Sequence, residues 1–204
     1  MKSSSKLRQE IAAAAARIVA LEGVSDYLSA KKKAAIQLGL TPNKNLPTNQ
    51  EIENALISYQ SLFQSEKNRQ VLSEFRQTAL QAMKVLAQYR PLLVGSLVSG
   101  TVTSSSEIVL HLFSDNVESV GLFLNERGIP CRISEKNLRL DASTSVAFPA
   151  YRFIADQVSI LLVVFSEKDR NLSPISPVSN KAMQSLSLTE LEAIIARDAD
   201  SASH

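Results

Sequence analysis

Residues 95–110 read GSLVSGTVTSSSEIVL, and their types and spacing suit phosphate and metal chemistry. The Gly-Ser pair ends an apolar run, where glycine lets the backbone approach a ligand closely and serine adds a hydroxyl. A loop rich in Ser and Thr follows. The next apolar run starts with Glu107, whose carboxylate is the kind of oxygen ligand that Mg²⁺ prefers. The segment therefore predicts a phosphate-binding loop beside a single metal-binding acid.

The spacing resembles that of the polymerase-β-like nucleotidyltransferase superfamily, whose active members typically read G-S-x-x-x-G-T-x-x-x-S-D-h-D-h, where h is apolar. The matching positions are Gly95, Ser96, Gly100 and Thr101, followed, after one extra loop residue, by Ser106, Ile108 and Leu110. The resemblance covers roughly residues 91–165. It implies a nucleotide-binding loop formed by Gly95, Ser96, Gly100, Thr101 and Ser106.

The metal-binding part of that pattern is incomplete. Nucleotidyl transfer uses two Mg²⁺ ions, and the resemblance implies two acids on one strand and a third on a later neighbouring strand. Glu107, the candidate catalytic and metal-binding residue, stands at the first position, whereas Val109 stands at the second. The later strand, residues 158–165, is apolar apart from Ser159. We therefore expect a degenerate nucleotidyltransferase that acts by binding, with no cofactor, and with Mg²⁺ only if it is active.

Other interpretations of this segment stay open. The chain can be an active Mg²⁺-dependent nucleotidyltransferase with rearranged ligands, or residues 95–110 can be an ordinary strand–loop–strand connection. His111 shares a strand face with Glu107 and can act as a base or ligand, although we favour a structural role. The ligand of an inactive protein would be a nucleotide, a nucleic acid, a protein partner or a second copy of the chain.

Residues 15–40, AARIVALEGVSDYLSAKKKAAIQLGL, resemble the start of bacterial helix-turn-helix repressors of the TetR type. In such a regulator, Lys31, Lys32 and Lys33 would contact nucleic-acid phosphates. The long loop TPNKNLPT delays the next helix, however, and that helix begins with acidic residues. We therefore favour a solvent-exposed lysine face over a nucleic-acid-binding one.

The segments around these residues predict an α+β protein. Residues 1–90 predict a four-helix module, because apolar residues recur at three- and four-residue spacing and residues 48–51 form a capping box. After Pro91, short apolar or alternating runs predict strands, with one helix among them. Residues 187–190 predict a second capping box and a short last helix. The expected second domain, residues 91–204, is a mixed-sheet nucleotidyltransferase-like domain with flanking helices.

Composition narrows the class of protein. The chain has 204 residues, 45% of them hydrophobic, and a formal net charge of +2, which is typical of folded proteins. No apolar run approaches the roughly 20 residues that span a bilayer, so we expect no membrane association. The lone cysteine, Cys131, excludes an internal disulfide and is interpreted as a small buried residue. The lone thiol and the lack of a recognisable export signal together predict a cytoplasmic protein.

Overall fold

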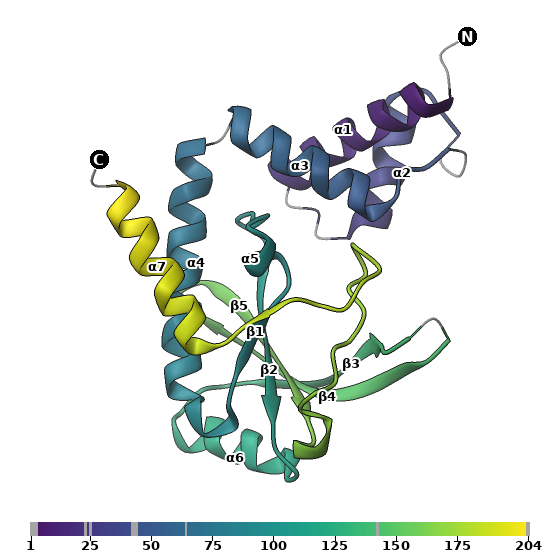
Figure 1. The fold of residues 1–204 in the computed structure, drawn as a ribbon. Helices are drawn as coiled ribbons and strands as arrows, with labels where there is room; N and C mark the ends of the chain where they lie inside the picture. The colour runs from purple at the N-terminus through teal and green to yellow at the C-terminus, as the bar shows by residue number, and fades with distance from the viewer. Residues whose placement is uncertain are drawn as a thin grey trace. The chain divides into compact units, whose positions relative to one another are not determined.

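The fold is α+β, as predicted from the sequence: N-terminal helices precede a six-stranded mixed sheet (Figure 1). The computed structural model describes residues 4–22, 24, 26–41, 45–63, 65–141 and 143–202. Gly23 and residues 42–44, which belong to the segments compared with helix-turn-helix repressors, lie outside the described residues.

The chain forms two compact units, and each contains three separate stretches of sequence. The helical unit comprises residues 1–72, 100–106 and 177–179. The sheet unit comprises residues 73–99, 107–176 and 180–204. The sequence pattern predicts a domain boundary at residue 90. The contacts instead assign most of the fourth helix, α4 (Ser65–Val85), to the sheet unit.

Three helices pack around one apolar core in the helical unit. They are α1 (Ser4–Glu22), α2 (Tyr27–Gln37) and α3 (Asn49–Phe63). Alanine and isoleucine dominate the core, and the small alanines let the helices approach closely. Its buried members are Ile11, Ala15, Ala16, Ile18, Val19, Ala30, Ala34, Ile52 and Leu56.

Side chains cap the starts of three helices, two of them at the capping boxes predicted from the sequence. The carboxylate of Asp26 accepts hydrogen bonds from two backbone N–H groups in the first turn of α2. At the start of α3, Thr48 and Glu51 bond to each other's backbone N–H groups. Ser187 and Glu190 make the same reciprocal pair at the last helix, α7 (Leu188–Ala202). These side chains satisfy backbone donors that a helix leaves free at its N-terminus.

Helix α7 is longer than the short helix predicted, since it contains 15 residues. Ion pairs join it to α4 within the sheet unit. Arg76 pairs with Asp198, and the ammonium of Lys84 lies 2.8 Å from a carboxylate oxygen of Glu192. These contacts are non-local, so the local sequence pattern does not reveal the full length of the helix.

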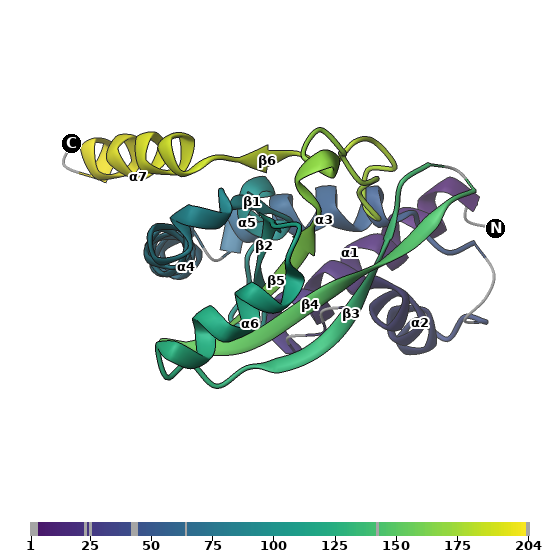
Figure 2. The ribbon, with the colours of Figure 1, turned by 90° about the horizontal axis from the view of Figure 1, so that it is seen from below.

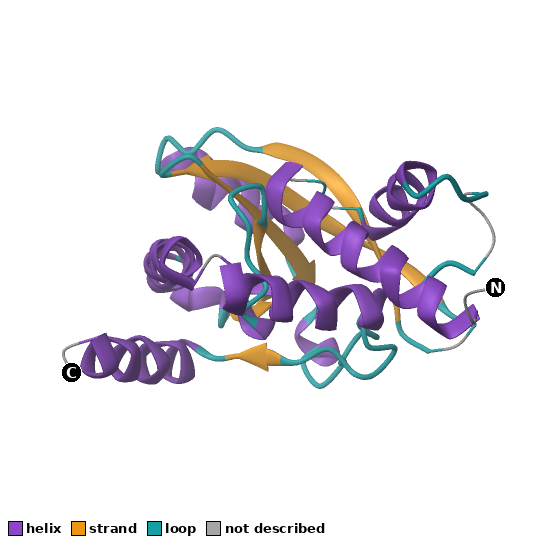
Figure 3. Ribbon diagram, turned by 90° about the horizontal axis from the view of Figure 1, so that it is seen from above, coloured by secondary structure: helices purple, strands orange, loops and turns teal. Residues whose placement is uncertain are grey.

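The sheet has the strand order β3-β4-β5-β2-β1-β6, and its strands form one layer, drawn in orange in Figure 3. The strands are β1 (Leu92–Val94), β2 (Glu107–Phe113), β3 (Arg132–Arg139), β4 (Ser145–Ala155), β5 (Val158–Phe165) and β6 (Ser185–Leu186). β2 and β5 are parallel, and all other neighbouring pairs are antiparallel. The parallel register places Glu107 directly opposite Ser159.

The two faces of the sheet have different surroundings. On one face, α4, α6 (Val117–Glu126) and Phe153 of β4 line a small cavity of about 160 Å³, and the Tyr151 hydroxyl donates to the Val117 carbonyl of α6. The opposite face carries Glu107 at one end and an apolar cluster beyond it. The cluster consists of Phe113, Leu138, Phe148, Ala150, Leu161, Val163 and Phe165.

Candidate functional site

Gly95 and Ser96 form the turn at which β1 ends. Gly95 has a φ of +84°, and its carbonyl accepts the N–H groups of Val98 and Ser99. Those bonds open the single helical turn α5 (Ser96–Ser99). A Cβ added at Gly95 would meet no atom within 4 Å. The left-handed backbone, rather than crowding, is therefore what favours glycine here.

Thr101, predicted to contact a nucleotide, is buried inside the helical unit. It is only 3% exposed, and its Oγ1 donates to Oε1 of Glu53 in α3 at 2.9 Å. The other oxygen of Glu53 accepts a 2.7 Å hydrogen bond from the Tyr27 hydroxyl of α2. Burial, reinforced by the charge of Glu53, raises the pKa of Tyr27. The three side chains form a cluster that holds the loop of residues 100–106 to two helices.

Gly100 and Ser106 stand at the two ends of that loop. Gly100 has a φ of +76°, and Ser106 Oγ accepts the backbone N–H of Thr103 at 2.9 Å. The Ser106 hydroxyl therefore stabilises a local turn. Glu53 was not predicted as a partner of the loop, because a single glutamate in an amphipathic helix has the pattern of a surface residue.

Glu107 begins β2, and its carboxylate has protein partners on both oxygens. Arg152 of β4 donates Nε to Oε1 at 2.7 Å and Nη2 to Oε2 at 3.3 Å. Ser159, opposite Glu107 on β5, donates its hydroxyl to Oε1 at 2.7 Å. The hydrogen bond to Glu107 raises the pKa of Arg152. A guanidinium therefore supplies the positive charge that balances this carboxylate.

The donor set around Glu107 does not fit a pair of Mg²⁺ ions, which need several oxygen ligands. The side chain two residues along the same strand face is Val109, which packs against the apolar cluster. The side chain opposite Glu107 is a serine hydroxyl. Within the part of the chain that the structure describes, no group of three or more His, Cys, Asp or Glu side chains could hold a metal ion.

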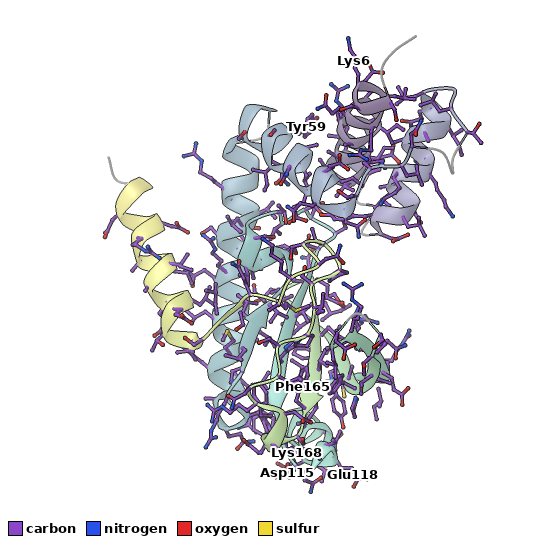
Figure 4. The ribbon with its side chains drawn as sticks, turned by 45° about the vertical axis from the view of Figure 1, so that its right-hand side comes forward. Lys6, Tyr59, Asp115, Glu118, Phe165 and Lys168 are labelled. Atoms are coloured by element: carbon purple, nitrogen blue, oxygen red, sulfur yellow. The ribbon has the colours of Figure 1, made fainter. Side chains whose placement is uncertain are left out.

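The next acid along the chain lies at the other end of the strand. Asp115 follows β2, and its Oδ1 accepts the backbone N–H of Glu167 at 3.0 Å. Figure 4 shows Asp115 beyond Phe165, at the end of the sheet. Because β2 advances about 3.3 Å per residue, Glu107 is about 20 Å or more away. Asp115 therefore cannot complete a metal site with Glu107.

His111 lies on the same sheet face as Glu107 but inside the apolar region. It is 5% exposed, and its ring centroid is 4.7 Å from that of Phe165. Burial lowers the pKa of His111 to about 4, so the ring is uncharged at neutral pH and serves as a packing residue. Cys131, predicted to be buried, is half-buried just before β3.

The three lysines of α2 have different surroundings. Lys31 is buried, and its ammonium donates to the Pro47 carbonyl at 2.8 Å and to Asn49 Oδ1 at 2.9 Å. Burial lowers the pKa of Lys31. Lys32 and Lys33 are exposed, and Lys33 pairs with a glutamate of α1. Lys31 therefore fixes the loop before α3, and the three side chains do not share one phosphate-facing surface.

No family model, curated protein or solved structure matches the chain. Among the helices in the described ranges, none is long and apolar enough to cross a membrane. The interpretation of the site therefore depends on its own geometry.

Thr101→Val is expected to lower the free energy of unfolding by about 1–2 kcal/mol, because a buried carboxylate oxygen of Glu53 loses its donor. Urea titration followed by circular dichroism measures the change. Ser104→Ala, at an exposed hydroxyl in the same loop, is the control and should have little effect. Unchanged stability in Thr101→Val would contradict the structural role of this hydroxyl.

His111 is expected to make the protein less stable as the pH falls. Its folded-state pKa of about 4 lies below the ordinary value of 6.5, so the unfolded chain takes up the proton first. Between pH 7 and pH 4.5 this group should remove about 2.5 kcal/mol of stability. His111→Leu should lack this part of the pH dependence. Urea unfolding of both proteins at the two pH values measures it, and equal losses would refute the burial effect.

Proposed function

We propose that this protein is a nucleotidyltransferase-like protein that acts by binding and does not transfer nucleotides. The observation that carries the proposal is the state of the Glu107 carboxylate. Arg152 and Ser159 bond to it at 2.7 Å, and an arginine beside the carboxylate repels a divalent cation. A metal ion entering this site would have to displace the guanidinium and would then find a single carboxylate.

The topology of the sheet supports the relation to nucleotidyltransferases. In that superfamily a later neighbouring strand carries the third acid. Here β5 is the parallel neighbour of β2, and Ser159 lies directly opposite Glu107. On this proposal, Ser159 and Val109 stand where two further acids would complete a metal site. Both positions carry side chains without a charge.

The phosphate loop keeps only part of the features that the resemblance implies. The turn at Gly95 and Ser96 keeps the left-handed glycine that the resemblance implies. Thr101 and Ser106, in contrast, use their hydroxyls in contacts within the helical unit. Candidate ligands are a nucleotide at Gly95 and Ser96, a nucleic acid, or a protein partner.

Calorimetry against a panel of nucleoside triphosphates, with and without Mg²⁺, tests the proposal together with an assay for pyrophosphate. We expect no pyrophosphate release. Any nucleotide affinity should be independent of Mg²⁺, because Arg152 already balances the charge of Glu107. The control is Glu107→Ala. Pyrophosphate release by the natural protein that disappears in Glu107→Ala would identify an active enzyme with rearranged ligands and would overturn the proposal.

Restoring the acids should restore a metal site. The test variant combines Val109→Asp, Ser159→Asp and Arg152→Gln, so that Glu107 and the two new carboxylates share one sheet face. We expect Mn²⁺ to bind to it at least about tenfold more tightly than to the natural protein. Electron paramagnetic resonance of free Mn²⁺ measures the affinity. The matched control carries Asn at positions 109 and 159, with the same change at Arg152, and should not bind. Equal Mn²⁺ affinities in two folded variants would contradict the proposed acid positions.

A further inference from the structure

The sheet face that carries Glu107 also carries a line of cations on its edge. Arg152 reaches Glu107 and therefore points to this face. Arg132 of β3 lies directly opposite Arg152 in the antiparallel ladder, so it points to the same face. Since strand side chains alternate, Ser134 and Lys136 share that face too. We call Arg132, Ser134, Lys136 and Arg152 the cationic line.

Two members of this line face each other with like charge. Directly opposite residues on antiparallel strands have Cβ atoms about 5 Å apart, a distance at which like charges destabilise the sheet. Glu107 compensates Arg152. Arg132 and Lys136 are exposed, and neither side chain has a hydrogen-bond or ion-pair partner among the described residues. The strands of this face thus bring three cations together with one anion.

The cationic line is extended and open along its length. β3 is the edge strand of the sheet, and β3 and β4 lie side by side (Figure 2). Residues two apart on a strand are about 6.6 Å apart, so Arg132 and Lys136 mark the ends of a line about 13 Å long. A linear ligand with repeated negative charge matches this arrangement better than a compact one with a single cluster of charge.

We infer that the cationic line binds the phosphate backbone of a single-stranded nucleic acid. Arginine presents a planar fork of donors that matches phosphate oxygens, lysine adds a point charge, and Ser134 adds a hydroxyl donor. Ile154, 75% exposed two residues from Arg152 on the same face, offers apolar contact to a base. Backbone-tracking cationic surfaces are common among single-strand binders. This inference rests on the proposed binding function and names its ligand.

Fluorescence anisotropy with a labelled 20-nucleotide oligothymidylate and an oligouridylate tests the inference at 50 and 200 mM salt. Glu107 already balances the charge of Arg152, so two phosphate contacts, by Arg132 and Lys136, are counted. They predict a slope of log affinity against log salt of about −1.4, which is about a 7-fold loss of affinity over this range. In Arg132→Ala/Lys136→Ala, binding at 50 mM salt should weaken by about tenfold or more, and the slope should flatten by about 1.4. Circular dichroism and urea unfolding establish that the variant is folded.

The matched control is Lys32→Ala/Lys33→Ala, which removes two exposed charges from the helical unit and should leave binding unchanged. Loss of binding in this control, with none in the sheet variant, would overturn the assignment in favour of the helices. No binding at 50 mM salt would also overturn it. Polyglutamate that competes as well as the oligonucleotide at equal charge would assign the line to an acidic protein instead. None of these results bears on pyrophosphate release, so the two proposals fail separately.

Discussion

Neutralising one carboxylate is the constraint on which the central part of the sheet depends. Glu107 starts a central strand and is only partly exposed, so its charge needs a partner. Arg152, from a strand beyond β5, supplies that partner at 2.7 Å, and Ser159 supplies a second donor. The same contacts link β2, β5 and β4 through their side chains. They also direct the arginine to the face on which Arg132 and Lys136 lie.

A second carboxylate gives the hydroxyl-rich loop its structure. Glu53 is buried, and the hydroxyls of Tyr27 and Thr101 each donate to one of its two oxygens. A loop whose composition suggests an open phosphate site is therefore partly used to satisfy a buried acid. Both carboxylates show that the ligands a side chain can bind depend on the protein groups that already contact it.

Local features were predictable from the sequence, and non-local ones were not. The capping box at Thr48 and the strand at residues 107–113 follow from patterns within a few residues. The Arg152–Glu107 and Thr101–Glu53 contacts join residues 45 and 48 positions apart, and no local pattern contains them. The burial of His111 has the same origin, because its ring packs on Phe165 of a different strand.

The loop of residues 100–106 also affects how this protein can change over evolution. It belongs by its contacts to the helical unit, although the residues on both sides of it belong to the sheet unit. A domain attached through one linker can be gained, lost or exchanged by a single genetic fusion. Here the helices cannot be replaced in one such event without leaving Thr101 and its neighbours unpaired. The two units are therefore expected to be inherited together, and substitutions at Glu53 and Thr101 should occur in concert.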